Sequence, residues 1–361
     1  MTTKHCTLTY RLSFNTPAFL GNAEQQAQWR TPPIKALIRQ WWRVVKARSC
    51  GYDIARLLAA ENELFGAAGE EGKSWGQSRI RLRLEHWEPG QMKPPVGDFV
   101  EHRESPVKKV AANTYLGYGP LGAKKDRTAL DPAKAHNRLH LRIGGDAAAA
   151  TVPDVQAAIQ LAAWFGGLGS RARNGFGSLH WEAEGPTPAL HSLAADSLDA
   201  VSLDFQQALR QDWPHAIGLD LKGRPLVWRT AKIHPTWLAA MKELAILKIA
   251  LRTSRPFEFT SGGNLGHPQP LPRHVLAYPA GGKHAVDAKG WGKDGRMANQ
   301  LRLRLHREAG GFRGVIVHVP CGVPSHMRAS VRQMPDEQRV WATVHDFFDH
   351  RQELIRLGGE R

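Results

Sequence analysis

Short segments in which apolar and polar residues alternate at every second position recur along this chain. In the first of them, apolar side chains stand at Cys6, Leu8, Tyr10, Leu12 and Phe14. A period of two predicts a β-strand with one buried face. Similar alternation occurs near residues 79–84, 139–143 and 301–306. Sheets that bury one face are typical of antiparallel α+β folds, so we expect this fold class and not a doubly wound parallel sheet.

Amphipathic helices separate these strands. After Thr31-Pro32-Pro33, apolar residues follow the helical period from Ile34 to Val45, and further helices are predicted at 53–65, 236–252 and 336–357. Two segments are rich in glycine, proline and basic residues: 93–137 is predicted to be a long excursion or hairpin, and 261–296 a long loop. A third segment, 186–197, is predicted to be a linker between an N-terminal domain (1–185) and a C-terminal domain (198–361).

The overall charge indicates an anionic partner. The 361 residues include 49 Lys and Arg against 33 Asp and Glu, which gives a formal net charge of +16. Nucleic acid is the commonest polyanion for such a chain, although charge alone leaves open an anionic membrane surface or a charge that serves only general solubility. The weakly charged segment 155–169 is too short to span a bilayer, so we expect a soluble, cytoplasmic protein. The three cysteines are far apart, and no disulfide framework, metal site or cofactor is expected.

The predicted helix at 34–45 carries a basic row. Lys35, Arg39 and Arg43 are spaced by four residues and therefore share one helix face, with Arg30 and Lys46 at either end. Like charges at this spacing repel one another, and no acidic residue lies between Glu24 and Asp53 to relieve the repulsion. A track of phosphates would relieve it. The alternative is an ordinary solvated face beside the core.

A glycine-rich stretch, 166–177, is the second candidate for an anion site. Its glycines superficially match the dinucleotide-binding fingerprint, but a predicted helix precedes the stretch and a strand follows it, which is the reverse of that motif. We expect it instead to cradle an RNA backbone with its main-chain N–H groups and neighbouring side chains. A turn packed against the core is the alternative. The candidate residues are Gly167, Gly169, Arg171, Arg173, Asn174 and Gly175.

The remaining candidates for chemistry are aromatic and histidine residues. Trp29 lies outside the predicted helix, next to Arg30, and could stack on a base, whereas Trp41 and Trp42 fall on the apolar stripe. None of the 17 histidines belongs to a recognisable triad or HExxH motif. A general base assembled from distant positions is left open by the sequence.

Several of these segments, in this order, resemble the RAMP superfamily, and within it the family of Cmr subunit one from type III-B CRISPR–Cas effector complexes. They are residues 14–21, 29–43, 63–66, 78–79 and 166–178, with Gly119 also fitting. The resemblance covers most of residues 5–180 and is loose beyond them. Two positions depart from it: Ala36 replaces an expected helix glycine, and Asn174 replaces a second arginine before Gly175. These departures indicate altered RNA contacts or a divergent branch.

The resemblance implies two tandem ferredoxin-like (RRM-like) domains and a non-catalytic subunit that holds the guide RNA backbone near its 3′ end. It also implies help in capturing target RNA in antiviral defence, and contacts with other RAMP subunits. Two alternatives remain. One is a RAMP-type endoribonuclease that processes precursor guide RNA, and the other is an assembly module that binds partner subunits and binds RNA only weakly by itself.

Overall fold

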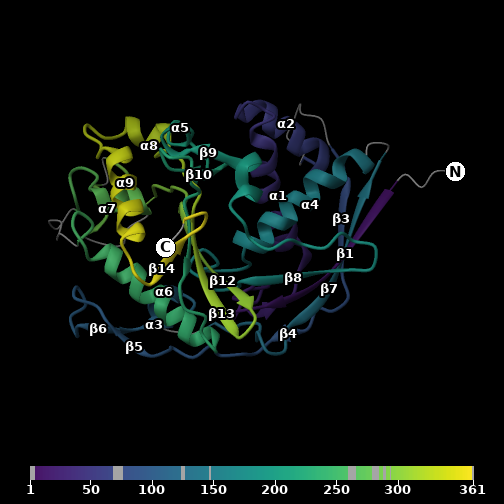
Figure 1. Ribbon diagram of the computed structural model, residues 1–361, viewed down its shortest axis with the longest axis horizontal. Helices are drawn as coiled ribbons and strands as arrows, with labels where there is room; N and C mark the ends of the chain where they lie inside the picture. Colours follow the sequence, from purple (N-terminus) through teal and green to yellow (C-terminus); the bar gives the residue numbers. More distant parts are fainter. Residues whose placement is uncertain are drawn as a thin grey trace. The chain divides into compact units, whose positions relative to one another are not determined.

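The computed structural model describes residues 5–67, 76–122, 127–145, 148–258, 266–278, 284–287, 290–292 and 294–359 (Figure 1). The chain divides into two compact units, and each gathers more than one stretch of the sequence. The first comprises 1–95, 117–193 and 304–312, and the second comprises 96–116, 194–303 and 313–361. The continuous domains 1–185 and 198–361 stay a prediction.

The first unit contains a four-stranded antiparallel sheet. Its strands are β1 (His5–Phe14), β3 (Ile80–Leu84), β7 (His136–Gly144) and β8 (Leu179–Glu184), in the order β3-β7-β1-β8. Helix α1 (Thr31–Ala47) connects β1 toward β3, and α4 (Ala148–Phe165) connects β7 to β8. This βαββαβ order with these strand neighbours is the ferredoxin-like arrangement. Helix α2 (Ile54–Phe65) is added between α1 and β3.

A second ferredoxin-like arrangement lies mostly in the second unit, although its residues 304–312 belong to the first. Strand β11 (Val227–Thr230), helix α6 (Trp237–Arg252), strands β12 (Leu301–Glu308) and β13 (Gly311–His318), helix α9 (Glu337–Asp349) and strand β14 (Leu354–Arg356) follow one another. The sheet order is β12-β13-β11-β14, which again places the first strand between the third and fourth. The predicted α+β class with two tandem ferredoxin-like domains is therefore confirmed.

Shorter elements complete the described chain. They are β2 (Ala27–Gln28), β4 (Pro89–Gly90), β5 (Phe99–Glu101), β6 (Lys109–Ala111), α3 (Ala112–Gly117), η1 (Asp196–Val201), β9 (Ser202–Asp204), α5 (Phe205–Ala208), β10 (Ile217–Leu219), α7 (Pro272–Leu276) and α8 (Ser325–Ala329). The segment 93–137, predicted to be a long excursion or hairpin, holds a β5–β6 hairpin and also helix α3. The predicted loop 261–296 includes α7, and parts of it lie outside the described residues.

The predicted periodicities bury the expected side chains in the first unit. In β1, Tyr10, Leu12 and Phe14 are fully buried, and in α1, Ile34 and Trp41 are fully buried as well. Prolines in the first turn of α1 fit there because that turn needs no main-chain donors. One helix and the face of the sheet toward it therefore supply much of the first core.

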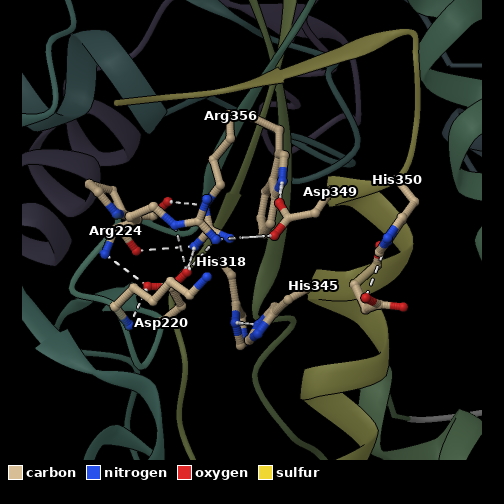
Figure 2. Close-up of polar contacts among 11 residues, drawn as sticks. Asp220, Arg224, His318, His345, Asp349, His350 and Arg356 are labelled. Atoms are coloured by element: carbon tan, nitrogen blue, oxygen red, sulfur yellow. Dashed lines mark hydrogen bonds and ion pairs between the residues drawn. The ribbon is translucent and has the colours of Figure 1, made fainter. Parts of the chain in front are cut away.

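The last helix is shorter than the sequence predicted. It ends at Asp349 and not near residue 357, because residues 354–356 form strand β14, which pairs with β11 at the edge of the second sheet. Figure 2 shows why this ending is stable: the Arg356 guanidinium lies between Asp220 and Asp349. Arg356 Nη1 donates to Asp349 at 2.7 Å, and Nη2 lies 3.2 Å from Asp220. Its side chain is only 6% exposed, so these carboxylates replace the water it loses.

A pair of buried histidines lies beneath this network. His318 Nδ1 and His345 Nε2 are 2.9 Å apart, and His318 Nε2 is 3.1 Å from the side-chain oxygen of Gln300. His318 also stacks on Trp341. Burial lowers the pKa of both histidines, that of His345 to about 3. The pair is therefore neutral, with one ring donating to the other.

We predict that the free energy of unfolding is highest above pH 6.5 and falls as the pH drops below that ordinary histidine pKa. Below this pH the two histidines bind protons in the unfolded chain but stay neutral in the folded one. The free energy of unfolding therefore falls by up to about 1.4 kcal/mol per pH unit for each histidine. Urea unfolding followed by tryptophan fluorescence between pH 7.5 and 5 measures this loss. His345→Gln should flatten the pH dependence, whereas the exposed control His326→Gln should not. A wild-type stability that does not change over this range would contradict the prediction.

Candidate nucleic-acid interface

The basic row on α1 has an acidic partner. Arg39 and Arg43 both donate to the carboxylate of Glu61, which comes from α2 and is 1% exposed. Burial raises the pKa of Glu61, but the hydrogen bonds and charges of Arg43 and Arg39 outweigh it, so the pKa lies below its usual value. The repulsion within the row is thus relieved by Glu61. This residue lies beyond the window from Glu24 to Asp53 in which the sequence shows no acid.

The two lysines of the row are also engaged within the protein. Lys35 Nζ donates to the main-chain oxygen of Phe65 at 3.1 Å and to Ser78 Oγ at 2.7 Å, which satisfies a carbonyl at the end of α2. Burial and the charge of Arg39 lower the pKa of Lys35. Lys46 Nζ lies 3.0 Å from Asp154 of α4. These side chains fasten α1 to its neighbours.

The residues just before α1 differ from one another. Trp29 is 3% exposed and its ring stacks on Phe14 with centroids 4.7 Å apart. The expectation that Trp29 stacks on a base is therefore not supported, since core packing occupies the ring. Arg30 is half-buried, and its Nε has no hydrogen-bond partner in the described part of the chain.

The glycine-rich loop is packed against the chain that follows β1. Gly169 has a φ of +88°, and a Cβ there would lie 2.5 Å from the carbonyl oxygen of Phe19. The N–H of Ser170 donates to that same oxygen at 3.0 Å, and the N–H of Gly177 donates to Pro17 at 2.9 Å. The glycines are needed for this close approach of two backbones. These main-chain donors are used within the protein and are not available to an anion.

Two side chains of the loop reach the surface. Arg171 and Arg173 are exposed, whereas Asn174 is buried. Arg171 adopts a φ of 61°, and its guanidinium lies so close to Gly119 that a Cβ there would be 3.2 Å from Nη2. Gly175 accepts hydrogen bonds from the hydroxyls of Thr16 and Ser178, which fix the turn. The loop is thus a rigid support for its exposed arginines. Gly167, at its start, likewise approaches the backbone of Gly177.

A pocket of about 680 Å³ in the first unit was not predicted from the sequence. It brings together residues from three separate stretches: Trp29, His86, Glu88, Pro89, Gly90, Gln91, Met92, Leu130, Asp131, Lys134, Ala135 and His136. Asn137 holds two of these stretches together, because its side chain donates to the carbonyl of His86 at 2.8 Å. The pocket thus combines two histidines, a lysine and two carboxylates.

Two further kinds of site are missing from the described ranges. No group of three or more His, Cys, Asp or Glu side chains there could hold a metal ion. Nor does any helix within those ranges combine the length and the hydropathy that a bilayer-spanning segment requires.

We predict that losing either Arg39 or Arg43 alone is tolerated, while losing both is not. One arginine still neutralises Glu61 after Arg39→Gln or Arg43→Gln, but the double variant leaves a buried carboxylate unpaired. The double variant should lose about 3 kcal/mol or more of the free energy of unfolding, more than the sum of the single losses. Adding Glu61→Gln should restore part of that loss. Urea unfolding of the four variants measures this, and strictly additive losses would contradict the pairing.

The sequence matches the RAMP superfamily over residues 11–180. No curated protein sequence matches the chain. Among solved structures, Cmr1 from Pyrococcus furiosus (apo form) is similar with 13% identity and a TM-score of 0.48, over 94% of this chain and 97% of that chain. A Type III-B Cmr-beta structure bound to cognate target RNA is similar with 12% identity and a TM-score of 0.45, over 87% and 94%. Likeness at this level carries no functional argument.

The matched residues extend from within β1 to the start of β8. They include α1, α4 and the whole glycine-rich loop, and so nearly all of the first ferredoxin-like arrangement. Residues 11–180 of this chain are thus similar in sequence to the RAMP superfamily, over nearly all of that arrangement.

Proposed function

We propose that this chain is a non-catalytic RNA-binding subunit of a type III CRISPR effector complex in the cytoplasm. In this role it holds the guide RNA backbone near its 3′ end, helps to capture target RNA, and contacts other RAMP subunits. The resemblance of residues 14–21, 29–43 and 166–178 to Cmr subunit one suggests this place within the superfamily.

The observation that carries the proposal is the RAMP match over residues 11–180 together with the fixed glycine-rich loop. That loop presents two exposed arginines on a backbone that is held by hydrogen bonds on both sides. A rigid support loses little conformational entropy when a ligand binds. The net charge of +16 favours a polyanion over a neutral ligand.

Of the basic residues that the sequence predicts to bind RNA, fewer remain as candidates, because Lys35 and Lys46 are engaged within the protein. Arg30, Arg171 and Arg173 remain the main candidates for phosphate contacts. Arg39 and Arg43 share one carboxylate, so the pair with Glu61 still carries one net positive charge. Each of these two side chains is about one third exposed, which leaves part of the guanidinium accessible to RNA.

We predict that Arg171→Gln with Arg173→Gln weakens binding of guide RNA by about the same factor for RNAs of different sequence. A plot of log K against log salt has a negative slope. For every RNA phosphate that is no longer neutralised, this slope should become shallower by about 0.7. Fluorescence anisotropy over a salt series measures both quantities. The control is Arg255→Gln with Arg332→Gln, which removes the same charge from two exposed arginines of the second unit. Equal weakening in both variants would indicate a general charge effect and contradict a specific role for the loop.

The pocket that contains His86 and His136 favours one alternative, a metal-independent endoribonuclease. Two histidines and a lysine around one cavity could serve as general acid, general base and phosphate ligand for cleavage next to a 2′-hydroxyl. This arrangement is the observation that keeps an enzymatic function open.

The non-catalytic proposal predicts no cleavage of precursor guide RNA by the purified chain or its complex in EDTA. Gel analysis of labelled precursor over several hours measures this. Cleavage that His136→Ala and His86→Ala abolish, and that His326→Ala leaves intact, would overturn the proposal in favour of the enzyme. Binding of partner subunits that survives nuclease treatment, without any binding of RNA, would instead indicate an assembly module.

A further inference from the structure

The first sheet has an open face that no sequence motif singled out. Along its four strands, the residues toward the helices are buried or partly buried, and the alternate residues form the other face. Those that are exposed or partly exposed include Thr7, Arg11, Arg81, Arg83, Arg138, His140, Arg142, Glu182 and Glu184. The aromatic residues of these strands, Tyr10, Phe14 and Trp181, are buried on the opposite side. The open face is therefore polar and strongly basic.

Strand pairing concentrates three arginines at one corner of this face. Arg81 of β3 lies directly opposite Arg142 of β7, and Arg83 lies opposite His140. On the other side of β7, Thr7 lies opposite Arg142. Side chains directly opposite one another in an antiparallel sheet have their Cβ atoms about 5 Å apart. Like charges in that position are unfavourable unless an anion lies between them.

Acidic residues neutralise the other end of the face. Arg138 Nε donates to Glu184 at 2.5 Å, and its Nη1 lies 3.1 Å from Glu85. Arg11 also pairs with Glu184, at 2.8 Å. His140 Nε2 lies 3.2 Å from Glu85. The arginines there have carboxylate partners and no unmet requirement for an anion.

The corner itself has no carboxylate partner among the described residues. The side chains of Arg81 and Arg83 make no hydrogen bond or ion pair with any part of the chain that the structure describes. Arg142 Nη2 donates to His5 Nδ1 at 3.0 Å, which is a contact with a basic group and not with a carboxylate. We name Arg81, Arg83 and Arg142 the arginine corner. It carries three positive charges that no described acidic side chain compensates.

We propose that the arginine corner binds the phosphodiester backbone of single-stranded RNA, as a second contact beside the glycine-rich loop. The inference rests on the proposed RNA-binding function and adds a site to it. Arginine suits phosphate because its planar guanidinium can donate two hydrogen bonds to one group. Arg81 and Arg142 can share one phosphate across the strands. Arg83, two residues along β3 and so about 7 Å away, can contact the next.

The chemistry of the face favours an RNA backbone over other partners. A protein partner would be expected to need apolar or aromatic residues at the centre of its contact, and the corner exposes arginine, histidine and threonine. Sheets of RRM type that read bases do so with exposed aromatic rings, and this face has none among its described strand residues. Binding at the corner should therefore be independent of RNA sequence.

The test compares two triple variants in the full chain and in its complex. Arg81→Gln/Arg83→Gln/Arg142→Gln removes the corner, and Arg103→Gln/Arg255→Gln/Arg332→Gln removes three exposed arginines of the second unit. Anisotropy with two single-stranded RNAs of unrelated sequence is measured over a salt series. The corner variant should bind both RNAs more weakly by about the same factor. Its slope of log K against log salt should be shallower than that of the wild type by about 2. The control variant should change the slope by less than half of that.

Folding can be checked separately. Because the corner opposes like charges, its removal should leave the melting temperature unchanged or raise it. If the wild type binds RNA and the corner variant binds it equally well, the corner is not an RNA site, while the proposed function stands. If the wild type binds no RNA alone or in its complex, the proposed function itself fails. Loss of a partner subunit with unchanged RNA binding would identify the corner as a protein interface and overturn the proposal.

Discussion

In the first unit, a four-stranded antiparallel sheet is covered by helices on one face and left open on the other. Because only one face is buried, the charged side chains of the strands must lie on the other face. Leu139, Leu141 and Ile143 of β7 must face the helices, so the residues between them must face solvent. The pairing of β7 with β1 and β3 then fixes which charges become neighbours. A shift of register by one residue would bury arginines and expose the core.

The same constraint explains why basic residues of one chain serve different purposes. Arginines on α1 are near α2, where a buried glutamate needs them, and so they contribute to the stability of the unit. Arg81 and Arg83 on β3 meet no carboxylate among the described residues, and the arginines of the glycine-rich loop stand on a fixed turn. The formal charge of +16 is therefore a poor guide to the number of groups available to RNA. The positions of the carboxylates decide that number.

The elements predicted correctly from the sequence are those that depend on local pattern. The alternation in β1 and the helical period in α1 are visible within about fifteen residues, and both were predicted near their observed positions. The ferredoxin-like arrangement came from the family resemblance and is confirmed by the two sheet orders. The glycine-rich loop was located correctly as a structural feature, although its backbone donors are largely engaged within the protein.

What the sequence could not supply are contacts between distant segments. Glu61 lies in another helix from Arg39, and the ring of Trp29, just before α1, stacks on Phe14 at the end of β1. The end of α9 was misplaced because the residues after it join β11, far back in the chain. A signal for the arginine corner was present: Arg81 and Arg83 alternate with apolar residues in β3. Their significance depends on Arg142 lying opposite, which only the register of β7 reveals.

Strand β14 also bears on how the second unit assembles during synthesis. Its partner β11 is made more than a hundred residues earlier, and both neighbours of β11 in the finished sheet come late. Until residues 354–356 leave the ribosome, β11 lacks one partner, and Asp220 and Asp349 lack the Arg356 guanidinium that lies between them. Contacts of such long sequence separation form slowly. Strand β11 therefore stays unpaired for much of the synthesis of the second unit, a period in which chaperones or an early-bound partner would have the greatest effect on its yield.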